Sequence, residues 1–236
     1  MKSPSFAASG LLCLAALGVN AAPIVITQDF ETCANVAACG ASVTFAGDAS
    51  AASVNLRQAN NTINTSVNDG FDGFFGSRFL VIGDDSGNMA GEPNGQTNGA
   101  LSRASFGLGN LDAGTYTFAV SFDYVADSRS PAPNPDDFSV LFETAPGAAS
   151  ALATVLQASD IAPNSAAFRE VGFSWLGSFT LAAASDVYLS FELEEFNGDA
   201  SAAAGIDNLS IRQIPEPGTL ALVGLALVGA SLRRRR

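Results

Sequence analysis

The sequence predicts an all-β fold, an antiparallel two-sheet jelly-roll sandwich, and three observations support this prediction. Apolar and polar residues alternate along several stretches, turns rich in Gly, Pro, Asn and Asp separate them, and no helical period persists between residues 22 and 212. Many alternating strands without helices between them favour two sheets packed face to face. An immunoglobulin-like sandwich is less favoured, because a chain of 236 residues is much longer than that fold requires.

The clearest strand lies within residues 115–124, where one face is apolar and mostly aromatic: Tyr116, Phe118, Val120, Phe122 and Tyr124. Residues 187–194 alternate in the same way, and residues 138–142 form a shorter apolar stripe. We expect further strands at residues 24–28, 43–45, 79–82, 100–106, 168–175 and 209–212. Long loops are expected at residues 60–77, 84–98 and 127–136.

The folded part of the chain is predicted to be strongly acidic. The formal net charge is −12, although Lys2 and the four arginines at 233–236 lie in the terminal segments. The remaining basic residues are Arg57, Arg78, Arg103, Arg129, Arg169 and Arg212. Such a domain repels nucleic acid and anionic lipid and favours cations, so we expect no nucleic-acid partner. An acidic surface that serves only solubility explains the same charge.

The N-terminus has the pattern of a secretory signal. Lys2 precedes an apolar run at residues 6–19, and the small residues of Val19-Asn20-Ala21 place a signal-peptidase cut after Ala21. Cys13 lies inside the apolar run without a lipobox before it, so it is not expected to carry a lipid. We therefore expect a signal peptide at residues 1–21, and a protein that is exported.

Export leaves two cysteines in the mature chain, Cys33 and Cys39. Two cysteines six positions apart in an exported protein favour a local disulfide. A zinc site needs further ligands, and the chain contains no His.

The C-terminus reads Ile214-Pro215-Glu216-Pro217-Gly218-Thr219, followed by an apolar run at residues 220–232 and four arginines. Two prolines separate the preceding strand from the apolar run, which leaves an extended and accessible junction. The run is shorter than the roughly 20 residues of a stable membrane span, and the terminal arginines are expected to stay cytoplasmic. We expect a transient anchor in the inner membrane.

This order of motif, apolar helix and basic end resembles the PEP-CTERM sorting signal of bacteria that carry an exosortase and make exopolysaccharide. The resemblance implies that Pro215, Glu216 and Pro217 form the recognition motif. It also implies that an exosortase cuts near them, so that the protein reaches the cell envelope, the surface or the extracellular space. The predicted domains are thus the signal peptide, a sandwich at 22–213 and a sorting signal at 214–236. A simple tail anchor is the alternative for the last segment.

The two ends of the predicted sandwich carry acidic residues. Asp29-Phe30-Glu31 follows the first strand, and Ile206-Asp207-Asn208 opens the last. First and last strands of a jelly roll commonly pair, and two buried carboxylates need a cation or a proton between them. The segments resemble the ends of concanavalin-like and MAM-type jelly rolls, which makes Glu31 and Asp207 candidate ligands of a structural calcium, with Asp29 and Asn208 as weaker candidates. An ordinary turn at Asp207 with a solvated Glu31 is the alternative.

Evidence for catalysis is thin. Without His, no Ser-His-Asp or Cys-His arrangement exists. Glu192 and Glu194 share one side of a strand, as a glycosidase pair requires, but that side is expected to face solvent. Trp175 is expected in the core rather than on a sugar-binding surface. We therefore favour a non-enzymatic structural or adhesive protein, with a carbohydrate-binding module for exopolysaccharide as the alternative and a glycoside hydrolase third.

Overall fold

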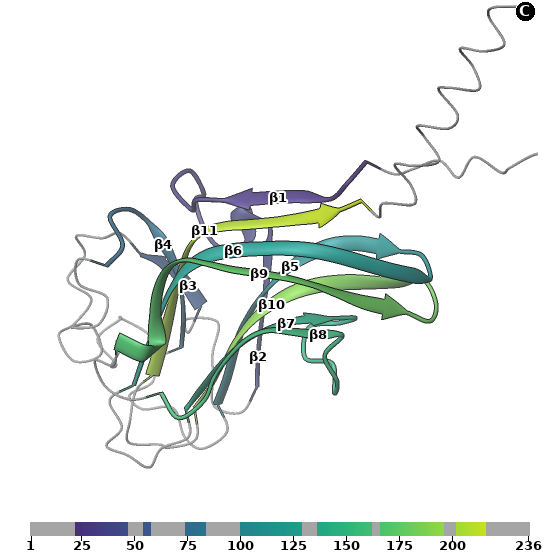
Figure 1. Ribbon diagram of the computed structural model, residues 1–236. Coiled ribbons are helices and arrows are strands. Elements are labelled where there is room, and N and C mark those ends of the chain that lie inside the picture. The colour runs from purple at the N-terminus through teal and green to yellow at the C-terminus, as the bar shows by residue number, and fades with distance from the viewer. Residues whose placement is uncertain are drawn as a thin grey trace, which may run out of the picture.

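The computed structural model describes residues 22–46, 54–57, 74–83, 100–128, 136–161, 166–195 and 202–215. These residues form two antiparallel sheets packed face to face, which confirms the predicted two-sheet sandwich (Figure 1). The predicted signal peptide, the sorting segment beyond Pro215 and most of the long predicted loops lie outside the described residues. The helices expected on both sides of the sandwich fall there as well.

Sheet A is the larger of the two. Its order is β3 (Val54–Arg57), β4 (Phe79–Gly83), β11 (Ala202–Ile214), β6 (Gly114–Ser128) and β9 (Arg169–Leu181), and β1 (Val25–Gln28) also pairs with β11. Sheet B has the order β2 (Ala41–Ala46), β5 (Ala100–Leu111), β10 (Ser185–Glu195), β7 (Asp137–Glu143) and β8 (Ala153–Ala158). Short 3₁₀ turns occupy Ala37–Cys39 and Ala166–Phe168.

An aromatic core fills the space between the sheets, because the alternating stripes predicted for residues 115–124 and 187–194 both face inward. Phe118 of β6 stacks on Phe179 of β9 with ring centroids 5.7 Å apart. Phe122 meets Phe191 of the opposite sheet edge to face at 5.3 Å. Trp175 belongs to this core, where its ring lies 5.6 Å from that of Phe142. Burial of such large rings is the main source of stability.

The first and last strands lie side by side, as expected for the ends of the sandwich (Figure 1). Val25 pairs with Arg212 and Gln28 pairs with Leu209. Beyond the last residue pair that joins β11 to β1, the Gln213 backbone N–H donates to the Ile24 carbonyl at 2.8 Å, and the Gln213 side chain accepts from the Ile24 N–H at 3.2 Å. The start of β1 is thus held against the end of β11.

Sheet A contains two β-bulges, one in β11 and one in β9, at neighbouring positions on either side of β6. Asn208 and Leu209 of β11 stand opposite a single residue of β6, and two residues of β9 stand opposite Asp123. The Asp123 carboxylate joins the bulges, since it accepts from the Gly172 N–H at 2.6 Å and from Asn208 Nδ2 at 2.8 Å. Bulges bend a sheet, and in Figure 1 the strands β9 and β11 curve strongly on that side of the molecule.

Candidate functional site

The acidic residues predicted at the two ends of the sandwich come together in the structure. The segment before β4 links them: the Ser77 hydroxyl donates to Asp207 Oδ2 at 3.1 Å, and the next backbone N–H, of Arg78, donates to Glu31 Oε1 at 2.7 Å. Asp207 is 2% exposed. Glu31 and Asp207, which are 176 positions apart in the sequence, therefore both accept hydrogen bonds from the short segment before β4.

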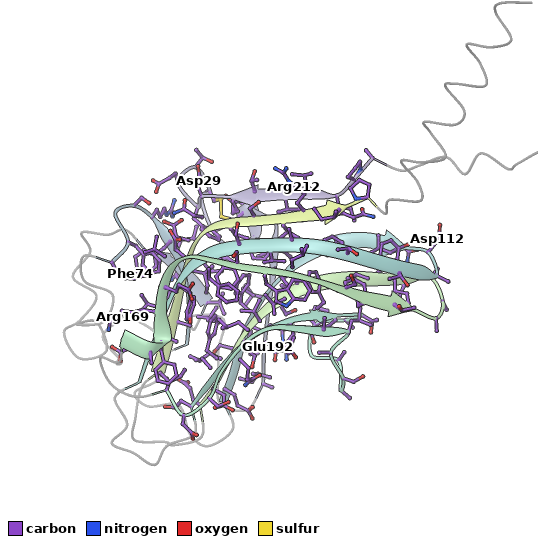
Figure 2. The ribbon with its side chains drawn as sticks, viewed as in Figure 1. Asp29, Phe74, Asp112, Arg169, Glu192 and Arg212 are labelled. Atoms are coloured by element: carbon purple, nitrogen blue, oxygen red, sulfur yellow. A yellow bond between two sulfur atoms is a disulfide. The ribbon has the colours of Figure 1, made fainter. Side chains whose placement is uncertain are left out.

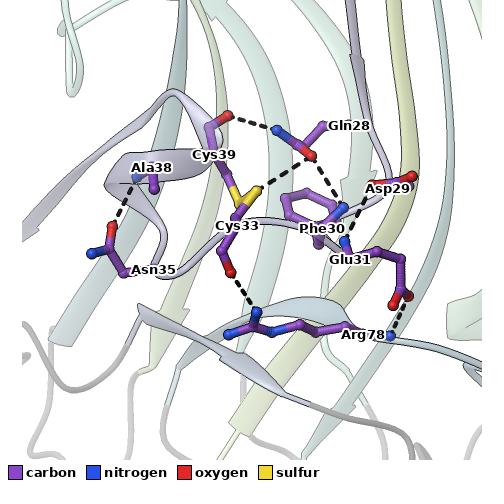
Figure 3. Close-up of a disulfide and its surroundings, with 9 residues drawn as sticks. All are labelled: Gln28, Asp29, Phe30, Glu31, Cys33, Asn35, Ala38, Cys39 and Arg78. Atoms are coloured by element: carbon purple, nitrogen blue, oxygen red, sulfur yellow. Dashed lines mark hydrogen bonds between the residues drawn. A yellow bond between two sulfur atoms is a disulfide. The ribbon is translucent and has the colours of Figure 1, made fainter.

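An unusual backbone conformation at Phe30 precedes Glu31, whose side chain contacts the segment before β4. Phe30, which is fully buried, has a φ of 60°. A bulky residue tolerates this left-handed region only when its surroundings enforce it. Here the Gln28 side chain accepts from the Phe30 N–H at 3.1 Å and donates to the Cys39 carbonyl at 2.9 Å (Figure 3). Asp29 is used locally, because its carboxylate accepts from the Glu31 N–H at 3.1 Å.

The structure joins Cys33 and Cys39 by a disulfide, which closes the loop that follows Glu31 (Figure 3). The Arg78 guanidinium donates to the Cys33 carbonyl, so the same segment that contacts Glu31 also holds the disulfide loop. Both sulfur atoms are used in this bond. The disulfide belongs to the scaffold that fixes Glu31.

Asp207 is the carboxylate of the site whose negative charge is least favoured. Burial raises its pKa to about 6, the hydrogen bonds from the Asn208 N–H and the Ser77 hydroxyl lower it, and the charges of Asp123 and Glu31 raise it further. No described cation contacts Asp207 in this part of the chain. A bound cation would relieve this excess of negative charge.

The donor set fits calcium in kind. Two carboxylates and a hydroxyl offer only oxygen ligands, which calcium prefers, and backbone carbonyls commonly complete its shell. Among the described residues, however, no three His, Cys, Asp or Glu side chains are grouped to hold a metal. The Asn208 amide donates to Asp123 Oδ2 at 2.8 Å. Calcium at Glu31 and Asp207 therefore stays a prediction.

A second polar group, which the sequence did not reveal, lies on the outer side of sheet B. Arg103 of β5 and Glu192 of β10 are direct cross-strand neighbours, and Arg103 Nε lies 2.5 Å from Glu192 Oε1. Their side chains are only 8% and 14% exposed. Glu143, at the end of β7, is 1% exposed and pairs across the sheet with Tyr188. Together with Ser190 we call these residues the polar cluster: Arg103, Glu143, Tyr188, Ser190 and Glu192.

The loop at residues 144–150 covers the polar cluster. The Gly147 and Ala148 N–H groups both donate to Glu143 Oε2 at 3.0 Å. Gly147 has a φ of 81°, and a Cβ atom there would lie 2.7 Å from Arg103 Nη1. The positive φ is the reason that glycine is favoured at this position. The second oxygen, Glu143 Oε1, is buried without a hydrogen-bond partner among the described residues.

The Glu192 and Glu194 pair does not have the solvated surroundings that we expected. Both side chains are on the outer side of sheet B, as the alternation predicts, but Glu192 is engaged by Arg103. Burial raises the pKa of Glu194, and the charges of Asp137 and Glu192 add to the rise. The reason is register: Glu194 pairs with Asp137 and Glu192 with Arg103, and sequence spacing does not encode which strands become neighbours.

The outer side of sheet A offers a shallow groove near the end of β11. It has a volume of about 610 Å³ and lies between Leu176, Ser174, Ala119, Arg212 and Ile214. Leu176 is 71% exposed, which makes this groove partly apolar. Figure 2 labels Arg212 on this outer side of the sandwich and Glu192 on the opposite outer side.

Strand β11 ends at Ile214, and Pro215 is exposed beyond it. Glu216 and Pro217 lie outside the described residues, as does the apolar run. In the described ranges, no helix is both long and apolar enough to cross a membrane. The chain is therefore a β-sandwich protein whose last strand leads directly into the predicted sorting segment.

That segment has a match. Residues 213–236 fit the family model of the PEP-CTERM protein-sorting motif, so the chain carries this motif at its C-terminus and the resemblance stated from the sequence is confirmed. Comparison with curated proteins finds no match.

Several solved structures resemble the sandwich loosely. The K1 cleaved adhesin domain of Lys-gingipain from Porphyromonas gingivalis is 10% identical, with 79% of this chain and 96% of that chain covered and a TM-score of 0.38. The tandem CBM22 domains of Xyn10C from Paenibacillus barcinonensis are 14% identical, with 84% and 48% covered and a TM-score of 0.40. TmCBM61 in complex with β-1,4-galactotriose is 9% identical, with 72% and 86% covered and a TM-score of 0.34. Scores this low assign neither a ligand nor an activity.

Proposed function

We propose that this chain is an exported surface protein that an exosortase processes, and that its sandwich serves as a non-enzymatic structural or adhesive module of the envelope or extracellular matrix. The observation that carries the proposal is the PEP-CTERM motif at residues 213–236, which begins where β11 ends. A folded body that stops at the motif leaves the cutting region accessible to a protease. A signal peptidase and an exosortase are the partners that this proposal requires.

The sandwich suits an extracellular module. Its disulfide, its acidic surface and its aromatic core favour stability and solubility outside the cell. We also propose that its path is a jelly roll, because the strand runs β1-β11-β6-β9 and β5-β10-β7-β8 face each other and most connections between them cross from one sheet to the other.

Replacing Pro215, Glu216 and Pro217 together by Ala tests the sorting step in a host that has an exosortase. We expect the variant to accumulate in the inner membrane with its C-terminal segment attached, while the wild-type chain reaches the surface or the medium. Replacing Pro131, Pro133 and Pro135 by Ala is the matched control and should leave sorting unchanged. Equal release of the Pro215 variant and the wild-type chain would refute exosortase processing.

We further propose that a structural calcium ion binds at Glu31 and Asp207. The buried Asp207 carboxylate and its acidic neighbours support this proposal. Chelation is expected to lower the melting temperature of the wild-type protein and to leave that of an Asp207→Asn variant unchanged. An unchanged wild-type melting curve, together with no calcium by elemental analysis, would end the idea.

The non-enzymatic assignment is also a proposal. The absence of His from the chain and the ion pair that engages Glu192 support it. A Glu192→Gln, Glu194→Gln variant that loses a hydrolytic activity present in the wild-type protein would favour the glycoside hydrolase instead. The carbohydrate-binding alternative has weaker support, because Trp175 packs against the aromatic core and is only partly exposed, although it also lines the groove near the end of β11.

A further inference from the structure

Strand β9 forms one edge of sheet A. It spans 13 residues and pairs with β6 on one side, and no described strand pairs with its other side. The other strands at the margins of the described sheets, β1, β2, β3 and β8, have only four to six residues. An edge strand presents a row of backbone N–H and C=O groups that can pair with a further strand. Among the described strands, β9 therefore offers the longest such edge.

Most of β9 lacks the features that keep edge strands from associating. Proteins protect such edges with charged side chains, proline, bulges or short strands. In β9 these features are confined to the first residues, where Arg169 and Glu170 are charged and the bulge lies. Residues 173–181, which we call the β9 edge segment, contain no charged residue, no proline and no break in register with β6. This segment is uncharged in a chain whose formal net charge is −12.

The side chains of β9 are apolar on both of its faces. Val171 and Leu176, at 70% and 71%, are the most exposed large apolar side chains among the described residues. On the inner face, Phe173 and Trp175 are only partly buried. Aromatic and aliphatic side chains of one strand are stabilised by cross-strand neighbours. A further strand beside β9 would therefore bury apolar surface on both sides of the sheet.

Charge favours a second copy of this chain as the neighbour. Two chains of net charge −12 repel each other over most of their surfaces. This repulsion is weak at the β9 edge segment, because residues 115–121 of the adjoining β6 are uncharged as well. On β11, the next strand of the sheet, Arg212 adds a positive charge opposite Ala119. Two copies thus bring together edges of equal length with no like charges opposed, whereas a different chain would have to supply an uncharged strand of its own.

We propose that two copies of this chain pair through their β9 edge segments in antiparallel fashion, which joins their A sheets into one continuous sheet. A two-fold axis at Gly177 lets the whole segment pair with its copy, as a symmetric dimer requires. On the outer face, Leu176 of one copy then lies opposite Ser178 of the other. On the inner face, Trp175 lies opposite Phe179. About eight to ten backbone hydrogen bonds form, which is typical of a stable protein–protein interface. This inference goes beyond sorting and does not depend on it.

Sedimentation equilibrium tests the pairing on the full-length chain in a density-matched non-ionic detergent. β9 runs parallel to β11, because both are antiparallel neighbours of β6, so the pair directs the two C-terminal ends of β11 in opposite directions. Detergent micelles permit this arrangement, since they do not hold both copies in one plane. We expect a reversible equilibrium between monomer and dimer that shifts with protein concentration. A chain that stays monomeric at every concentration overturns the proposal.

Two matched substitutions localise the contact. Leu176→Lys removes an apolar side chain and brings like charges of the two copies close together, so we expect it to weaken dimerisation at least about tenfold. Phe45→Lys makes a comparable change on β2, an edge strand of sheet B where Phe45 is 49% exposed, and it should leave dimerisation unchanged. Equal losses in the two variants overturn the proposal.

Amide hydrogen exchange in the wild-type chain tests the same contact without a substitution. In a strand that is paired on one side, only every second N–H is bonded within the sheet, whereas a strand paired on both sides uses all of them. Protection of the β9 edge segment should therefore change from alternating to continuous as the dimer forms. A dimer that keeps the alternating pattern associates through another surface, and this result also overturns the proposal.

Discussion

At the scale of single residues, the carboxylates differ in how their charge is accommodated. Glu192 has Arg103 as a close partner, whereas Glu143 accepts hydrogen bonds on Oε2 from the Gly147 and Ala148 N–H groups and is stabilised less by the charge of Arg103. Burial therefore raises the pKa of Glu143, and the charge of Glu192 adds to this rise against the opposing effects of Ser190, Arg103 and the Gly147 N–H. Such a carboxylate favours the folded state in its protonated form and opposes it when ionised.

This imbalance predicts a pH dependence of stability. Because the pKa of Glu143 is higher in the folded chain than in the unfolded chain, its stabilising contribution is full below about pH 4 and is lost as the pH rises through the folded-state pKa. The Glu143→Gln variant should lose less stability than the wild-type protein over that rise. Melting temperatures of both proteins, measured across the same pH series, check this, and parallel curves would contradict it. Asp207 contributes equally to both curves and cancels in the comparison.

At the scale of strands, the line of bulges across sheet A depends on residues that tolerate a left-handed backbone. Gly172 has a φ of 70° in β9, and Asn208 has a φ of 52° in β11. Asp123 lies between them and accepts a hydrogen bond from each. The bulges thus depend both on the left-handed backbone of Gly172 and Asn208 and on the hydrogen bonds of the Asp123 side chain. Substitutions can separate these two contributions.

Replacing Asn208 by Ala removes the hydrogen bond to Asp123. It also places in the bulge a residue that adopts the left-handed region less readily than Asn. We expect a loss of about 1–2 kcal/mol in the free energy of unfolding, and a smaller loss for Asn208→Gly. Asn110→Ala is the matched control, because Asn110 also donates its amide to an aspartate of a neighbouring strand, Asp186, at 3.1 Å. Denaturant unfolding in the presence of a chelator measures the three variants. Equal losses for Asn208→Ala and Asn110→Ala would rule out the backbone contribution.

Prediction from the sequence succeeded where a strand is long and its alternation is strong. The stripe from Tyr116 to Tyr124 faces the core as expected, and β1 pairs with β11. The short strands β3 and β8 escaped prediction, because four to six residues without an aromatic stripe carry little periodic signal. The polar cluster escaped it too. Arg103, Glu143 and Glu192 come from three strands whose pairing is set by the whole fold rather than by local spacing.

At the scale of the whole molecule, the last strand occupies an inner position. β11 pairs with β6 from Ala202 to Ile214, interrupted only by the bulge at Asn208 and Leu209, and with β4 and β1 on its other edge. Its side chains Ile206, Leu209 and Ile211 are buried in the core. A sandwich that lacks β11 therefore loses part of both its sheet and its core.

Truncation tests how much of β11 the fold requires. A chain that ends after Pro215 should fold with a cooperative unfolding transition, since all described strands are kept. A chain that ends after Asn208 loses the pairing with β1 and the buried Leu209 and Ile211, each of which contributes about 1.5–3 kcal/mol by burial. We expect the shorter chain to be unfolded or strongly destabilised. Near-ultraviolet circular dichroism and thermal unfolding compare the two, and equal stability would contradict the inner role of β11.

The inner place of the final strand has a consequence for secretion. A chain that crosses the membrane from its N-terminus exposes β11 last, so β1, β4 and β6 wait for their shared neighbour until translocation is nearly complete. Pairing between such distant parts of the sequence is slow, because the intervening chain must first be ordered. For a chain exported by the proposed route, we therefore expect the compact module to form only after β11 has emerged.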